Sequence, residues 1–257
     1  MAKDQKKTDK VKAYSNSAQD ESKYPNVHLY LPNLLGYVRF VAIIASWKFA
    51  LNDPMVFTAL YATSYLLGAV DGTVARALKQ CSFFGAQLDI LMSRFATESL
   101  IFVVLKLGIL NIKDDQEVMR FTLLFVTFFL SDFVSYWFQV YSSYLLDQES
   151  HVTSNPAIQA TLKLYKNPLV NFTVTALSEF FTFSFYMSFF PNQFKFVTTH
   201  PSYNIILQLA LVGAILKNLH NLLHLWTSSI RIVGLDCAQK NAVAQQEGPY
   251  VQDKKKK

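Results

Sequence analysis

The sequence predicts an all-α, polytopic membrane protein with six transmembrane helices. Apolar residues make up 51% of the 257 residues, and phenylalanine alone occurs 22 times. Several apolar runs reach the roughly 20 residues that a helix needs to cross a bilayer. A soluble domain of this length could also bury a large core. It would rarely contain so many long runs with so few charges, so the membrane class is favoured.

The six expected spans follow one another with short connections. They cover approximately residues 31–50, 55–78, 84–110, 118–145, 167–190 and 203–226. Pro32 is compatible with the first of them, because the first helical turn does not need its missing N–H. The longest internal polar stretch is expected between Asp147 and Lys166. An even number of spans puts both ends of the membrane domain on one side.

The charge distribution indicates which side that is. Residues 1–23 form a lysine-rich tail without an apolar core, which predicts disorder rather than a cleaved signal peptide. The membrane domain is expected over 24–233, followed by a lysine-ended tail over 234–257. Lysine and arginine gather in the tails and near the turn at Lys79, so both termini and this turn are expected to face the cytosol.

The net charge of +6 therefore belongs mainly to tails that suit anionic lipid, and not to a nucleic-acid-binding face. Lys254 and Lys255 stand where a dilysine retrieval signal would be, which predicts the endoplasmic reticulum membrane. The two cysteines, Cys81 and Cys237, are far apart and match no metal-binding spacing, so free thiols are expected.

One stretch, Gly68 to Ser93, carries charged side chains in an otherwise apolar setting. A charge at membrane depth is costly and indicates a functional site. Gly68 and Asp71 are three residues apart, and Asp89 and Ser93 are four apart, so each pair shares a helix face. The stretch therefore predicts a helical hairpin with its polar groups at one end.

The spacing within this stretch resembles the signature of the CDP-alcohol phosphatidyltransferase family, D-x2-D-G-x2-A-R-x8-G-x3-D-x3-D. Six of its eight fixed positions match, at Asp71, Gly72, Ala75, Arg76, Gly85 and Asp89. The first and last acids of the signature are replaced by Gly68 and Ser93. We expect Gly68 to leave room for the side chain of an acid.

The resemblance implies the chemistry of the hairpin. In this family two metal ions, Mg²⁺ or Mn²⁺, clamp the reacting oxygens, and Asp71 and Asp89 stand at metal-ligand positions. Four other matched residues stand at nucleotide-binding positions: Gly72, Ala75, Arg76 and Gly85. Ser93 stands where the family has its general base, and a hydroxyl is no base at neutral pH. Loss of a general base costs about 10²–10⁴-fold in rate.

Three further segments, LPNLLGYVRF, SDFVSYWFQVYSS and NPLVNF, extend the resemblance to the phosphatidylinositol synthase branch of the family, from about Leu31 to the end of the chain. The branch implies CDP-diacylglycerol and myo-inositol as substrates in a membrane lipid environment. It also implies a homodimer, or a heterodimer with a related chain. Asn33, Arg39 and Asp132 are the additional candidates for substrate binding.

Two functions remain open at this stage. The chain is either a phosphatidylinositol synthase-type enzyme or a catalytically impaired relative that binds CDP-lipid or partners an active sister chain. Several polar residues also have purely structural interpretations. Asp71 and Asp89 could form a polar pair between helices, Arg76 could be an ordinary membrane-end arginine, and Asp132 could bridge helices. Glu179, His220 and His224 are expected to have structural roles in helix packing.

Overall fold

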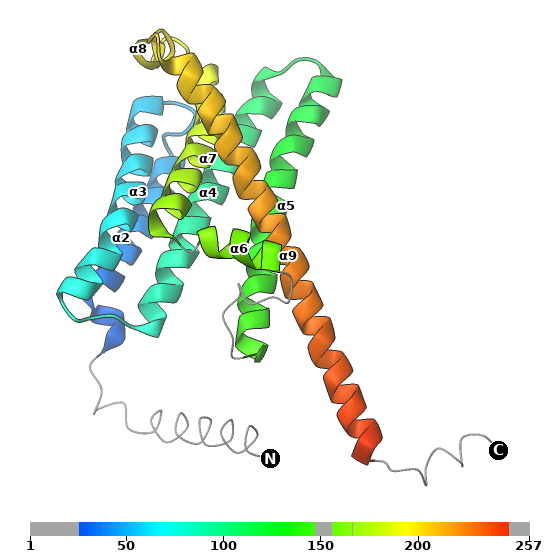
Figure 1. Ribbon diagram of the computed structural model, residues 1–257. Coiled ribbons are helices and arrows are strands. Elements are labelled where there is room, and N and C mark those ends of the chain that lie inside the picture. Colours follow the sequence, from blue (N-terminus) through cyan, green and yellow to red (C-terminus); the bar gives the residue numbers. More distant parts are fainter. Residues whose placement is uncertain (1–25, 147–155, 166, 247–257) are drawn as a thin grey trace. The chain divides into compact units, whose positions relative to one another are not determined.

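The computed structural model describes residues 26–146, 156–165 and 167–246, and these form helices and no strand. The elements are the 3-10 helix η2 (Val27–Leu29) and the α-helices α2 (Leu31–Trp47), α3 (Pro54–Ala77), α4 (Phe83–Asn111), α5 (Asp115–Leu146), α6 (Pro156–Tyr165), α7 (Pro168–Phe189), α8 (Lys195–Thr198) and α9 (Tyr203–Gln246). Figure 1 shows them in chain order. The all-α class is confirmed for this part of the chain.

Each predicted span coincides with a helix, namely α2, α3, α4, α5, α7 and α9, but two details differ. Helix α9 continues to Gln246 instead of ending near Trp226, because the polar residues that follow contain no proline to stop it. The polar stretch before Asn167 contains a short helix, α6, which begins at Pro156. Proline is well suited to a first helical position, since its N–H would have no partner there.

Two helices of the described part are long and apolar enough to cross a membrane, over Asp115–Leu145 and Tyr203–Asn241. The six-span count therefore stays a prediction. The lysine-rich N-terminal tail and the Lys254–Lys255 pair lie outside the described residues.

The first of two compact units comprises residues 26–48 and Val56–Ala96 of the described chain. It contains η2, α2, most of α3 and the beginning of α4. Phe95 on α4 packs against Phe40 and Trp47 on α2, with ring centroids 5.1 and 5.9 Å apart. The Gln80 side chain after α3 accepts a hydrogen bond from the backbone N–H of Leu31 at 3.0 Å. These contacts hold the ends of the three helices together.

The second unit comprises Phe49–Met55 and the described residues from Thr97 onward. Here α9 packs against both α5 and α7. The core contains Phe181 of α7 with Ala210 and Ala214 of α9, and the Leu177 side chain lies directly over Gly213. Small residues let two membrane helices approach closely, so α7 packs against this segment of α9.

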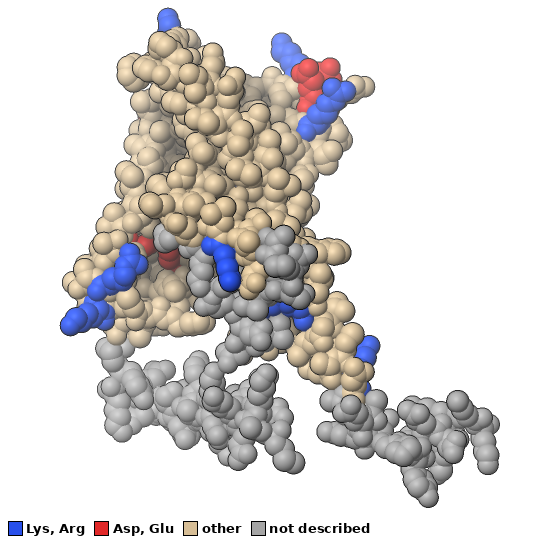
Figure 2. Space-filling model, viewed as in Figure 1, with Lys and Arg blue, Asp and Glu red and all other residues tan. Residues whose placement is uncertain are grey.

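Helix α9 exposes an apolar stripe on its other side. Its exposed large side chains include Ile205, Leu209, Val212, Leu216 and Leu219, which recur every three or four residues. In Figure 2 the visible face of this helix is uncharged over most of its length. A stripe at helical spacing that no other described element covers is what a lipid-facing helix presents.

Candidate functional site in the motif hairpin

The guanidinium of Arg39 lies between three residues at signature positions. Its Nη1 donates hydrogen bonds to Asp71 Oδ2 at 2.7 Å and to Asp89 Oδ1 at 2.8 Å. Its Nη2 donates to Ser93 Oγ at 3.0 Å. The three partners come from α3 and α4, whereas Arg39 comes from α2. One side chain therefore links all three helices of the first unit through the predicted site.

Burial strengthens the ion pair between Arg39 and Asp71 in particular. The side chains of Arg39 and Asp71 are 3% and 6% exposed, whereas that of Asp89 is 44% exposed. Attraction between opposite charges increases as water is excluded, and a buried carboxylate without a partner would be costly. Arg39 and Asp71 thus form the buried part of the cluster, and Asp89 forms its exposed rim.

Gly68 is the residue that makes room for this guanidinium. A Cβ atom at Gly68 would lie 2.5 Å from Arg39 Cζ and 2.9 Å from Nη1. The expectation that Gly68 leaves open space for an acid is therefore wrong. The space next to Asp71 is filled by Arg39, because two carboxylates and a hydroxyl attract the guanidinium to it.

Arg76 lies on α3, five residues after Asp71 in the sequence. Its Nη2 donates to Thr73 Oγ1 at 3.4 Å, and its Nη1 lies 3.6 Å from the position that a Cβ on Gly72 would take. Asp71 Oδ1 accepts the backbone N–H of Gly72 at 2.6 Å. Arg76 is exposed, so its guanidinium is accessible to an anionic group of a ligand, while Ala75 beside it is half-buried on α3.

Asn33 and Gly85 form a second contact of the first unit. Asn33 is buried, and its amide donates to the Val27 carbonyl at 2.6 Å. A Cβ on Gly85 would lie 2.6 Å from Asn33 Oδ1 and 3.0 Å from Ser82 Oγ. The motif glycine is thus needed for the close approach of α2 to the beginning of α4.

We expect Gly85→Ala to destabilise this hairpin by about 1–3 kcal/mol, because the added methyl group overpacks a filled contact. Thermal unfolding of the detergent-solubilised protein measures the effect. Gly234→Ala is the matched control, since nothing lies within 4 Å of a Cβ at that position. Equal midpoints for both variants would contradict the close packing of Asn33 against Gly85.

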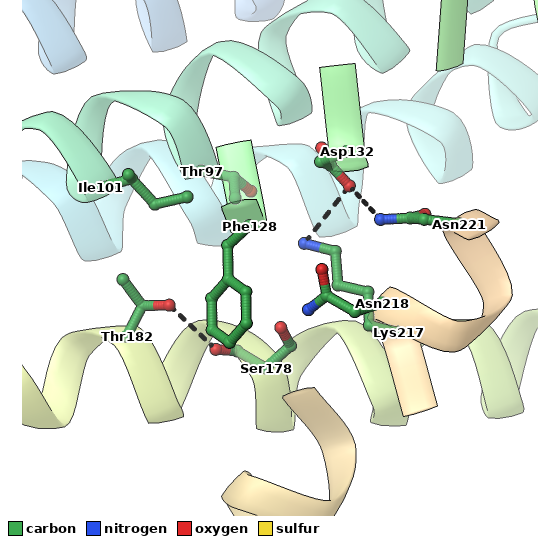
Figure 3. A pocket seen from close by; sticks show the side chains of 9 residues that line it. All are labelled: Thr97, Ile101, Phe128, Asp132, Ser178, Thr182, Lys217, Asn218 and Asn221. Carbon is green, nitrogen blue, oxygen red and sulfur yellow. Dashed lines mark hydrogen bonds and ion pairs between the residues drawn. The ribbon is translucent and has the colours of Figure 1, made fainter. Parts of the chain in front are cut away.

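Asp132 lies in the second unit, in a buried polar cluster between α5 and α9. Asn221 Nδ2 donates to Asp132 Oδ1 at 2.9 Å, and Lys217 Nζ lies 3.8 Å from the same oxygen. Figure 3 shows Lys217 and Asn221 pointing from α9 toward Asp132 on α5. The cavity beside them measures about 10 Å³, which is room for roughly one water molecule. Asp132 bridges two helices here.

Glu179 of α7 belongs to the same cluster. Thr97 Oγ1 donates a hydrogen bond to it, and Lys217 Nζ lies 3.8 Å from its Oε1. Sequence reasoning missed Lys217, although a lysine inside the apolar run of α9 is itself the signal of an intramembrane ion pair. His220 and His224 pack as expected, with the His220 ring stacked on Tyr165 at 3.8 Å and edge-on to His224 at 4.4 Å.

The motif residues do not fit a two-metal centre as they are folded. Only Asp71 and Asp89 remain of the four signature acids, and Arg39 Nη1 lies between their oxygens. Among the described residues, no group of three or more His, Cys, Asp or Glu side chains is arranged to hold a metal ion. Mg²⁺ is bound at about 2.0–2.1 Å from oxygen, so an ion that bridged Asp71 Oδ2 and Asp89 Oδ1 would have to take the place of Nη1.

Comparison with known proteins places the site in a family context. Residues 29–227 match the family model described as CDP-alcohol phosphatidyltransferase. The CDP-diacylglycerol–inositol 3-phosphatidyltransferase of Rattus norvegicus is 33% identical over 84% of this chain and 96% of its own. The protein of the same name from Saccharomyces cerevisiae is 33% identical over 71% of this chain and 79% of its own. No solved structure matches the chain.

Proposed function

Because the chain belongs to the CDP-alcohol phosphatidyltransferase family, we propose that it acts in phospholipid biosynthesis by transferring a phosphatidyl group from CDP-diacylglycerol to myo-inositol. The observation that carries the proposal is the similarity to inositol phosphatidyltransferases along 84% of the chain. The gathering of Arg39, Asp71 and Asp89 from three helices supports it, since a cluster of charged side chains in an apolar helical domain indicates a functional site.

The proposed reaction is a displacement at phosphorus. An inositol hydroxyl oxygen forms a bond to the phosphorus that carries diacylglycerol. The bond from this phosphorus to the bridging oxygen of the diphosphate breaks, and CMP leaves with that oxygen. The hydroxyl proton has to pass to a base. Arg76 is the residue that we assign to the diphosphate, because its exposed planar fork can bind two phosphate oxygens.

Members of this family generally use divalent metal ions. For the transferase we propose Mg²⁺ or Mn²⁺ at Asp71 and Asp89, which requires Arg39 to leave both carboxylates. Because these residues do not fit an ion in the arrangement described, we derive no step of the reaction through one. The nucleotide is assigned to Gly72, Ala75, Arg76 and Gly85, and inositol or phosphate to Asn33 and Arg39 of the same unit. Asp132 of the second unit is proposed separately as a substrate-binding residue.

A second candidate function is favoured by two residues of the site. Gly68 and Ser93 stand at the positions of two signature acids, and Ser93 Oγ accepts a hydrogen bond from Arg39 instead of offering a base. Loss of the base alone would lower the rate about 10²–10⁴-fold. The chain would then bind CDP-diacylglycerol without turnover, or pair with an active sister chain.

The proposal includes the membrane in which the protein acts and its oligomeric state. The relatives are membrane enzymes, and the apolar stripe of α9 suits the same setting. We propose the endoplasmic reticulum membrane with both termini cytosolic, and a homodimer or a heterodimer with a related chain.

An assay on membranes from cells that lack any other phosphatidylinositol synthase distinguishes the two candidate functions. The transferase predicts incorporation of labelled inositol into lipid, dependent on added CDP-diacylglycerol and increasing with Mn²⁺. The second candidate predicts CDP-diacylglycerol binding to the purified protein without labelled product. If the chain neither binds CDP-diacylglycerol nor forms product, both candidates are wrong.

A further inference from the structure

We propose that Arg39 is the resident cation of the motif hairpin and competes with a divalent ion for the carboxylates of Asp71 and Asp89. The family signature brings together four acids for metal binding and proton removal, whereas this hairpin brings together two acids and an arginine that is already bound to both.

Arg39 Nη1 is a single nitrogen that contacts one oxygen of each carboxylate, at 2.7 and 2.8 Å. A divalent ion that bridged the same two oxygens would bind each at about 2.0–2.1 Å and would occupy the volume that Nη1 holds. The guanidinium and the ion therefore exclude each other at this position.

Asp71 is buried, and a buried carboxylate needs a nearby cation. Arg39 supplies one positive charge between two carboxylates, so the cluster keeps a single net negative charge without an added ion. The exposed guanidinium of Arg76, on the same helix as Asp71, adds a second positive charge to the hairpin. These two positive charges weaken the repulsion between the carboxylates and a negatively charged diphosphate.

Gly68 allows this arrangement. Any side chain at this position would begin with a Cβ 2.5 Å from Arg39 Cζ. An acid at position 68 would therefore force the guanidinium to move away from Asp71 and Asp89. Loss of the signature acid and gain of an internal cation are therefore two aspects of one site. It follows, on the basis of the proposed function, that CDP-diacylglycerol binds to this chain without a divalent ion.

Mn²⁺ binding to the purified full-length protein, followed by electron paramagnetic resonance, tests the competition without any need for turnover. We expect weak Mn²⁺ binding to the unmodified protein and at least about tenfold tighter binding to Arg39→Gln, which is within the usual range of coupling between two ligands. Adding Asp71→Asn to Arg39→Gln should abolish the increase in Mn²⁺ affinity. This result would show that the ion binds at the hairpin. Lys79→Gln is the matched control, because it removes an exposed positive charge from the same hairpin.

Gly68→Ala provides a second route if Arg39→Gln does not fold, since the methyl group displaces the guanidinium while its charge stays in the protein. It should also tighten Mn²⁺ binding. Unmodified protein that binds Mn²⁺ as tightly as the variants would overturn the proposal.

CDP-diacylglycerol binding in EDTA and in Mn²⁺ completes the experiment. We expect equal affinity in both for the unmodified protein, and a loss for Arg39→Gln in EDTA that Mn²⁺ restores. A strict requirement of the unmodified protein for Mn²⁺ would overturn the proposal. Absence of binding under both conditions would overturn the proposed function instead, and the Mn²⁺ titrations would then decide the competition by themselves.

Discussion

Replacing Gly68 and Ser93 together by aspartate should raise phosphatidylinositol formation by about 10²–10⁴-fold, which is the usual contribution of a general base. The double variant supplies both missing signature acids. It also displaces Arg39, because the new Cβ at position 68 would lie 2.5 Å from its Cζ. Asp71 and Asp89 are thereby released for a metal ion, so the new activity should depend steeply on Mg²⁺ or Mn²⁺. Inositol incorporation by membranes measures the change.

Each single variant should do much less, because metal binding and proton removal act as a unit. Gly68→Asn with Ser93→Asn is the matched control, since it has the same shape without the charges and should stay inactive. A double aspartate variant that folds, binds CDP-diacylglycerol and forms no product would show that the two acids are not the main defect. Unmodified protein as active as the double variant would also contradict this account.

Lys217→Met should lower the free energy of unfolding of the second unit by about 3–5 kcal/mol, the cost of leaving a buried ion pair with one partner. Lys217 Nζ lies 3.8 Å from both Asp132 Oδ1 and Glu179 Oε1, and all three side chains are at most 12% exposed. Without the lysine, the two carboxylates on α5 and α7 lose the cation that they share. Thermal unfolding in detergent measures the loss.

The control for this prediction is Lys195→Met, which removes an exposed lysine of the same unit. A triple variant with Lys217→Met, Asp132→Asn and Glu179→Gln should recover most of the stability, because the two carboxylates that shared the lysine are then replaced by neutral groups. If Lys217→Met changes stability by less than about 0.5 kcal/mol, as an ordinary surface substitution does, the cluster does not hold the three helices together.

The sequence by itself determined the helical segments and the hairpin. Runs of apolar residues are a local property of the chain, and they marked helices such as α2, α5 and α7 within a few residues. The spacings of Gly68 from Asp71 and of Asp89 from Ser93 placed each pair on one helix face, since helical periodicity is also local. Matched signature positions identified the family, which the comparisons confirm.

Only the tertiary structure decided what fills the site. Arg39 and Asp71 are 32 positions apart, and Arg39 and Asp89 are 50 apart, so no local pattern links them. Their contact depends on how three helices pack, and on a long flexible side chain finding two carboxylates where Gly68 leaves space. The same reason applies to Lys217, whose partners lie on α5 and α7. In both clusters the attraction between buried opposite charges selects the arrangement, and that attraction acts through space rather than along the chain.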